Sequence, residues 1–181
     1  FKDSYFTDPS NTIGAIYIVR DPRNIITSLK NHFSFKDYEE SKKFLFNETQ
    51  VLTLSEIEKE KFKNKKDHPL PQIIGSWQNH FRSWRTMKNN FLLIKYESLC
   101  QKPKREFSKI AEFLEKILKI KFSKKQINNA INSSSFEKLE KMEQTLGFAE
   151  AAENMSGGKK KFFYLGPKNN WKKILDKKIA D

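Results

Sequence analysis

Two short apolar runs are the clearest candidates for β-strands in this chain. The first, at residues 14–19 (GAIYIV), has no polar alternation, which is typical of a strand buried on both faces of a parallel sheet. The second occupies residues 91–96 (FLLIKY). Long helical patterns separate the two runs, so the sequence predicts an α/β protein. Two strands are fewer than a stable open sheet usually has, and we expect the complete fold to contain more.

A helix is predicted directly after the first strand. Asp21 can act as its N-cap, and Pro22 suits the first helical position. Apolar residues then recur at helical spacing, at Ile25, Ile26, Leu29 and Phe33. The pattern therefore predicts a strand–turn–helix unit.

Longer helices are predicted on both sides of the second strand. The helix before it has an apolar face made of Ile73, Trp77, Phe81 and Trp84. The helix after it begins at Pro103. Its apolar stripe consists of Phe107, Ile110, Ala111, Leu114, Ile117 and Leu118.

The carboxyl-terminal third predicts shorter elements. Ser123 with Gln126, and Ser134 with Glu137, have the spacing of capping boxes, which predicts a helix after each serine. Residues 145–161 contain small residues, two adjacent glycines and a lysine triplet, which predicts a mobile loop.

Length and residue usage limit the class of protein. A chain of 181 residues predicts one domain, 1–181. Since it begins at Phe1 and stops at Asp181 inside a helix-like pattern, we expect this domain to be partial, truncated at the N-terminus and also cut at the C-terminus. The single cysteine, Cys100, cannot form an internal disulfide and favours a reducing compartment. No segment approaches the roughly 20 apolar residues that span a bilayer, so we expect a cytoplasmic protein without a membrane span.

The charge favours anionic ligands. There are 35 Lys and Arg residues against 22 Asp and Glu residues, a formal net charge of +13. Charge alone leaves nucleic acid, an anionic membrane and a nucleotide-like cofactor open. The position of Arg20 favours a ligand that carries a phosphate, because Arg20 follows the first strand beside a helix N-terminus, where α/β proteins bind phosphate. Ser28, two turns along that helix, could donate a second hydrogen bond to the same anion. The alternative is an Arg20 that neutralises Asp21 and a Ser28 that faces solvent.

Four segments, in order, resemble the cytosolic-type sulfotransferases that use 3′-phosphoadenosine 5′-phosphosulfate (PAPS). Residues 17–28 (YIVRDPRNIITS) carry an Arg and, eight residues later, a Ser. The others are residues 75–84 (GSWQNHFRSW), 93–99 (LIKYESL) and 103–106 (PKRE). The resemblance extends from Ile16 to about Lys173. It implies a P-loop-NTPase-like sulfotransferase fold, in which helices flank a central parallel sheet.

The resemblance also implies cofactor contacts. Arg20 and Ser28 would bind the 3′-phosphate, and Tyr96 would contact the adenine. Ser134 and Phe136 match an element that lines the base, although Ser134 could equally be an N-cap and Phe136 a core residue.

Residues 162–172 resemble the family's last cofactor segment, usually Arg-Lys-Gly followed by Gly-Asp-Trp-Lys. Gly166 and Trp171 keep their spacing, but Tyr164 and Leu165 replace the basic pair. Backbone N–H groups near Gly166 could still bind the phosphate, or its charge could be met by a lysine from residues 159–161.

The resemblance implies transfer of a sulfuryl group from PAPS to a hydroxyl or amine of a small-molecule acceptor, leaving adenosine 3′,5′-bisphosphate, without a metal or nucleic acid. The family's phosphate loop and Lys-Thr-His segment precede the Arg20 strand and have no counterpart here. We therefore expect no catalytic residue in this chain, and we expect His32, His68 and His80 to be surface or packing residues. The acceptor and the oligomeric state are not predicted.

Three alternatives stay open. A basic nucleic-acid-binding protein would explain the charge but not the apolar helical stripe of Trp77, Phe81 and Trp84. A P-loop kinase fragment would require a Walker loop, which the chain does not show. A non-catalytic, nucleotide-binding sulfotransferase homologue is favoured only by Tyr164 and Leu165.

Overall fold

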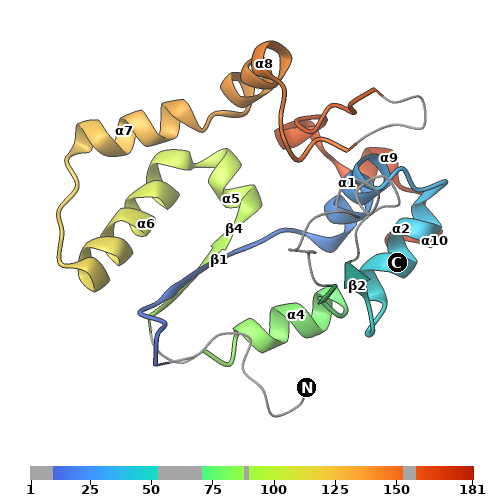
Figure 1. The fold of residues 1–181 in the computed structure, drawn as a ribbon, viewed down its shortest axis with the longest axis horizontal. Coiled ribbons are helices and arrows are strands. Elements are labelled where there is room, and N and C mark those ends of the chain that lie inside the picture. The colour runs from blue at the N-terminus through green and yellow to red at the C-terminus, as the bar shows by residue number, and fades with distance from the viewer. Residues whose placement is uncertain (1–9, 53–70, 88–89, 153–157) are drawn as a thin grey trace, which may run out of the picture.

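Two parallel strands form the centre of the fold. The structure, a computed structural model, describes residues 10–52, 71–87, 90–152 and 158–181. Strands β1 (Ala15–Val19) and β4 (Phe91–Lys95) pair in parallel, in a register that runs from Ala15 opposite Phe91 to Val19 opposite Lys95 (Figure 1). Both predicted strands are present. The second ends one residue earlier than expected, because Tyr96 begins a helix.

Helix α1 (Pro22–His32) follows β1 at once and has the predicted start. The Asp21 side chain accepts a hydrogen bond from the backbone N–H of Arg23, and Pro22 occupies the first helical position. Helix α2 (Tyr38–Phe46), which the sequence reasoning did not predict, packs against α1.

A second, two-residue ladder lies before the next helix. Strands β2 (Val51–Leu52) and β3 (Gln72–Ile73) pair antiparallel. The prediction that Ile73 shares a helix with Trp77 is therefore wrong. Helix α4 (Trp77–Trp84) begins only after Ser76, whose hydroxyl accepts a hydrogen bond from the N–H of Asn79 and caps the helix at that point.

The chain after β4 is helical, as predicted, with one helix more than expected. A short helix α5 (Tyr96–Gln101) precedes α6 (Pro103–Leu118), which begins at the predicted proline. Helix α7 (Lys124–Ser133) begins with the predicted capping box, in which Ser123 and Gln126 satisfy each other's backbone N–H groups.

Ser134 does not form the second predicted capping box. Helix α8 (Phe136–Leu146) has Ser135 at its N-cap position, and the Ser134 hydroxyl donates to the carbonyl of Ala130 at the end of α7. The preceding helix thus engages this hydroxyl. The predicted loop begins later than expected, because residues 145–146 still belong to α8, and its residues 153–157 lie outside the described residues.

The last segment contains three short elements, of which only a helix-like pattern at the end of the chain was predicted. They are a 3-10 turn, η1 (Gly166–Lys168), and the helices α9 (Trp171–Ile174) and α10 (Lys177–Ala180). Leu175 and Ile179 from this segment form a buried core cluster with Ile26 of α1 and Leu45 of α2. The carboxyl-terminal segment is thereby held against α1.

Helices flank the parallel strands (Figure 1). On one side, the ring of Tyr17 lies 5.9 Å from that of Trp84 in α4, centroid to centroid. Near the start of β1, Gly14 permits a close approach of the chain to α6, because a Cβ there would lie 3.2 Å from Cδ1 of Ile117 and 2.9 Å from the carbonyl oxygen of Asn90. These contacts fix the direction of β1, and with it the position of the residue that follows the strand.

Candidate functional site

Arg20 and Tyr96 lie side by side where the two parallel strands end. The register pairs Val19 with Lys95, so the next residue of each strand emerges at the same edge of the sheet. The guanidinium carbon of Arg20 lies 4.4 Å from the centroid of the Tyr96 ring, within cation–π range. The sheet thus delivers a cation and a phenol ring to one point.

Two more distant residues bind the same guanidinium. Arg20 Nη1 donates to Oγ of Ser28 at 3.3 Å, and Arg20 Nη2 donates to the carbonyl oxygen of Gly166 at 3.3 Å. The Nε of Arg20 is buried and has no hydrogen-bond partner within the described part of the chain. Since buried polar groups are nearly always hydrogen-bonded, this N–H is suited to an acceptor that a ligand brings.

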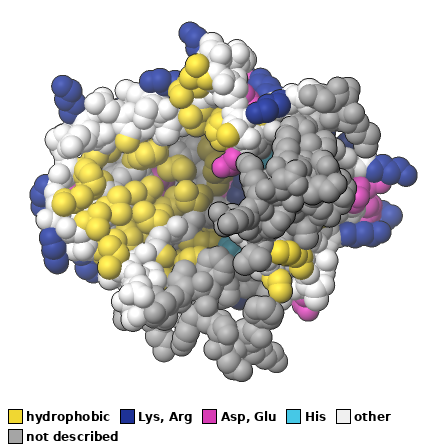
Figure 2. All heavy atoms as spheres, viewed as in Figure 1, with side chains coloured by type: hydrophobic (Ala, Val, Ile, Leu, Met, Phe, Trp, Pro, Cys, Tyr) yellow, Lys and Arg dark blue, Asp and Glu magenta, His cyan; other side chains and the backbone are white. Residues whose placement is uncertain are grey.

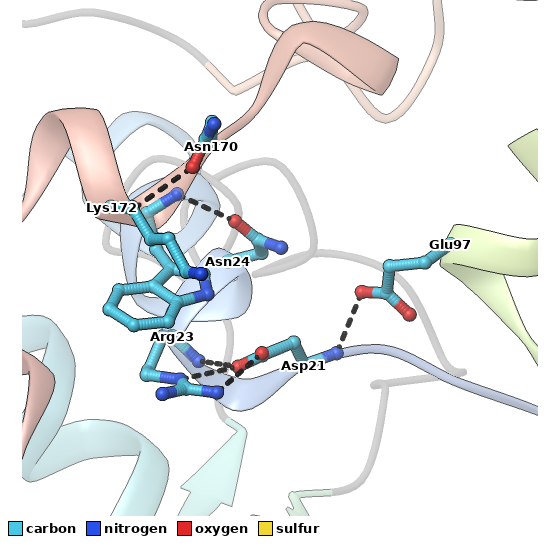
Figure 3. Close-up of polar contacts among 7 residues, drawn as sticks. Asp21, Arg23, Asn24, Glu97, Asn170 and Lys172 are labelled. Carbon is cyan, nitrogen blue, oxygen red and sulfur yellow. Dashed lines mark hydrogen bonds and ion pairs between the residues drawn. The ribbon is translucent and has the colours of Figure 1, made fainter. Parts of the chain in front are cut away.

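Asp21 does not neutralise Arg20. Its carboxylate accepts from Nε of Arg23 at 2.9 Å and from Nη2 of Arg23 at 2.8 Å (Figure 3). Partial burial opposes ionisation, but the hydrogen bonds from Arg23 outweigh it and lower the pKa of Asp21. The backbone N–H of Asp21 donates to the carboxylate of Glu97 at 2.9 Å, which ties the start of α1 to α5. Arg20 is therefore left for another anion.

Gly166 and Phe136 are in direct contact. Gly166 has φ of +49°, and a Cβ at this position would lie 2.1 Å from Cε2 of Phe136. Both the backbone conformation and the space therefore require glycine. The close approach places the Phe136 ring beside the carbonyl that holds Arg20.

All six residues predicted to contact the cofactor line one cavity of about 920 Å³. They are Arg20, Ser28, Tyr96, Ser134, Phe136 and Gly166. Helices α5 to α8 add an apolar lining of Leu99, Pro103, Phe107, Ile131 and Leu139. Hydrophobic side chains gather on the face of the molecule over α5 and α6 (Figure 2). The volume lies in the range of ligand-binding clefts.

Burial sets the protonation of Tyr96. Desolvation first, and then the neighbouring Cys100, raise the pKa of Tyr96 to about 12. The ring therefore stays a neutral phenol and keeps an apolar face toward the cavity, which Cys100 also lines.

His32 lines the cavity, although the sequence reasoning placed no histidine there. It lies one turn after Ser28 on α1, half-buried, with its ring edge-on to Phe33 at 4.6 Å and to Phe162 at 6.0 Å between centroids. Burial lowers the pKa of His32, with the carboxylate of Glu150 acting in the opposite direction. The four-residue spacing from Ser28 is the signal that could have indicated its position.

The other histidines do not lie at this cavity as far as the structure describes them. The Nδ1 atom of His80 is 3.0 Å from the hydroxyl of Tyr17, and its Nε2 accepts from the indole N–H of Trp84. Burial lowers the pKa of His80, so its contacts are those of a neutral packing residue. His68 lies outside the described residues.

Tyr164 and Leu165 line the cavity at the positions where the resemblance expects a basic pair. Lys160 and Lys161 also line it. Lys160 Nζ donates to the carbonyl oxygen of Asn31 at 3.3 Å, whereas Lys161 forms an ion pair with Glu140. Lys160 is thus the better placed of the two to add charge to the site.

Among the described residues, no group of three or more His, Cys, Asp or Glu side chains is arranged to hold a metal ion. No helix in the described ranges has the length and apolar character to cross a membrane.

Solved structures of two proteins share this fold. Mouse sulfotransferase SULT7A1 complexed with PAP matches with a TM-score of 0.60 at 20% identity, over 92% of this chain and 54% of that chain. Retinol dehydratase in complex with androsterone and inactive cofactor PAP matches with a TM-score of 0.60 at 16% identity, over 92% of this chain and 44% of that chain. The fold is therefore the predicted α/β sulfotransferase fold, with a parallel sheet flanked by helices.

Sequence comparisons agree. Sulfotransferase 2A1 of Mus musculus is 27% identical over 199 residues, which cover 99% of this chain and 60% of that protein. Sulfotransferase 2A1 of Homo sapiens is 25% identical over 194 residues, which cover 100% of this chain and 60% of that protein. The chain thus spans about 60% of the length of these relatives. The sequence model of the family described as "Sulfotransferase domain" matches residues 8–181, so the chain belongs to the sulfotransferase family.

Proposed function

We propose that this chain carries the part of a PAPS-dependent sulfotransferase that binds the 3′-phosphoadenosine end of the donor and of its product. The observation that carries the proposal is the common cavity. Six residues, separated by up to 146 positions in the sequence, line one space of about 920 Å³. Such convergence of distant polar and aromatic side chains is typical of a ligand site.

Arg20 and Ser28 form the phosphate end of this site. The guanidinium is oriented by its hydrogen bonds to Ser28 and Gly166, and its buried Nε still requires an acceptor. A phosphate oxygen is a strong acceptor, and its negative charge strengthens the hydrogen bond. These residues therefore fit the 3′-phosphate that PAPS carries and that AMP, ADP and ATP lack.

The adenine end is formed by Tyr96, Phe136 and Ser134. The two rings offer faces or edges to a base. The Ser134 hydroxyl already donates its proton to the carbonyl of Ala130 at 2.8 Å, so its oxygen is left as an acceptor. An acceptor at this place suits the exocyclic amino group of adenine.

The proposed reaction of the whole protein is sulfuryl transfer to a hydroxyl or amine of a small-molecule acceptor. PAPS supplies the activated sulfuryl group when it is bound. In this proposal the described residues of the chain contribute donor binding, and none of them is assigned a catalytic role. Support for a small acceptor comes from a cluster of aromatic rings in the cavity lining, formed by His32, Phe162 and Phe163.

The test is calorimetric titration with adenosine 3′,5′-bisphosphate and with adenosine 5′-monophosphate. We expect tighter binding of the bisphosphate. Arg20→Ala should lower the affinity for the bisphosphate roughly 30- to 100-fold, because a charge-assisted contact is lost. Arg82→Ala, an exposed residue on α4, removes the same charge away from the cavity and should leave affinity unchanged. Equal affinity of the unaltered chain for both nucleotides would refute the proposal.

A further inference from the structure

The side chain of Asn169 is inserted between the carboxyl-terminal segment and α1. The residue is 8% exposed, and the three polar partners that its side chain has among the described residues all belong to α1. Nδ2 donates to the carbonyl oxygen of Asn24 at 2.9 Å and to Oγ of Ser28 at 3.2 Å. Oδ1 accepts from the hydroxyl of Thr27 at 2.7 Å. One buried amide thus connects the segment to a residue that lines the cavity.

The orientation of this amide is determined by its surroundings. The carbonyl oxygen of Asn24 can only accept, so the amide nitrogen must face it. The amide oxygen then faces the hydroxyl of Thr27, which is 3% exposed and whose single proton is shared between this oxygen at 2.7 Å and the carbonyl oxygen of Asn24 at 2.8 Å. In this orientation Asn169 is a donor to Ser28 and cannot act as an acceptor toward it.

The contacts of Ser28 define what it can offer a ligand. A hydroxyl has one proton and two lone pairs. Arg20 and Asn169 both donate to Oγ of Ser28, which uses the two lone pairs. The proton points to the carbonyl oxygen of Asn24 at 3.1 Å. Ser28 therefore has no free lone pair and can bind a ligand only by turning its O–H from the carbonyl oxygen of Asn24 to that ligand; the two donors on its oxygen polarise the O–H and strengthen it as a donor.

We infer that Asn169 is a positioning residue for nucleotide recognition. It holds Ser28 as a hydrogen-bond donor and so favours a phosphate over a hydroxyl at the 3′ position of the nucleotide. This inference rests on the proposed function, because it requires the 3′-phosphate to lie at Arg20 and Ser28. Asn169 lies outside the cavity lining, and its effect on nucleotide selectivity is exerted through Ser28.

The test is a double-mutant cycle on selectivity. The measured quantity is the ratio of the affinities for adenosine 3′,5′-bisphosphate and adenosine 5′-monophosphate, obtained by calorimetry for the unaltered chain, Asn169→Ala, Ser28→Ala and the double variant. We expect Asn169→Ala to lower the ratio about fivefold, the size of one hydrogen bond. In the Ser28→Ala background the same change should have no further effect.

Two further variants separate positioning from stability. Thr27→Val removes the bond to Oδ1 of Asn169 but leaves its bond to Ser28, so the melting temperature should fall while the ratio stays that of the unaltered chain. Asn169→Asp keeps the shape but replaces the donor with an acceptor, and should lower the ratio at least as much as alanine. Because the ratio compares two ligands within each variant, a uniform loss of folded protein does not change it.

The outcomes distinguish the inference from the proposed function. A ratio near one in the unaltered chain would overturn both. A high ratio in the unaltered chain that persists in Asn169→Ala and Asn169→Asp would overturn only the inference. An undiminished effect of Asn169→Ala in the Ser28→Ala background would also overturn it, because the effect would then not pass through Ser28.

Discussion

Replacement of Gly166 by alanine should damage both stability and nucleotide binding. The residue has φ of +49°, and the added Cβ would lie 2.1 to 2.5 Å from three atoms of the Phe136 ring. A methyl group cannot fit at that distance, so the ring or the backbone must move. The Gly166 carbonyl oxygen accepts from Arg20, and the Phe136 ring lines the same cavity. Either movement therefore disturbs the site.

The expected cost follows from two contributions. A left-handed conformation costs an alanine about 1–2 kcal/mol. Displacement of the Phe136 ring breaks its edge-on contact with Phe163, whose centroid is 6.2 Å away, and such pairs contribute about 0.5–1.5 kcal/mol. We expect a loss of about 2–3 kcal/mol in the free energy of unfolding, measured by urea denaturation.

Gly147→Ala is the matched control. Gly147 also has positive φ, +72°, but no atom lies within 4 Å of the position that its Cβ would take. This variant should lose stability through backbone strain alone and bind adenosine 3′,5′-bisphosphate normally. The reasoning is refuted if Gly166→Ala is as stable as the unaltered chain, or if its affinity for the bisphosphate does not fall.

Three further predictions concern the cavity lining. The pKa of Tyr96 is raised from 10.0 to about 12, so the unfolded chain loses this proton before the folded chain does, and the free energy of unfolding should fall as pH rises from 10 to 12. Tyr96→Phe should show a smaller fall when both proteins are compared by urea denaturation. Because burial lowers the pKa of His32, the unfolded chain gains this proton before the folded chain does, and the free energy of unfolding should fall as pH drops below 6.5. An equal fall in the His32→Gln variant would contradict this prediction. Lys160→Ala should weaken bisphosphate binding more than Lys159→Ala, because Lys160 lines the cavity and Lys159 bonds to the carbonyl oxygen of Phe148; equal calorimetric affinities would count against a role for Lys160.

Local signals in the sequence predicted the elements that carry Arg20 and Ser28. The apolar run of β1, the Asp21 cap and Pro22 act within a few residues of one another, so the strand–turn–helix unit could be predicted without knowledge of the fold. The same holds for Pro103 at the start of α6. The packing of the short helices α9 and α10 could not be predicted in this way, because Leu175 and Ile179 pack against Ile26 and Leu45, which are far away in the sequence.

The sequence indicated six residues that lie together at one cavity, but it did not indicate the contacts between them. The family's spacing pointed to six residues that the structure places around one cavity. The hydrogen bond between Arg20 and Gly166 joins residues 146 positions apart and follows from packing alone. Asn169 was missed for the same reason, since its partners on α1 become neighbours only after the carboxyl-terminal segment has docked.

Phosphorus NMR of bound adenosine 3′,5′-bisphosphate tests the central claim most directly. The second pKa of a phosphate monoester is about 6 and falls when a cation binds the dianion. The account predicts that the 3′-phosphate signal titrates at lower pH in the complex than in free solution, and that Arg20→Ala removes most of this difference. A bound 3′-phosphate that titrates as it does in free solution would contradict the assignment of Arg20 as its partner.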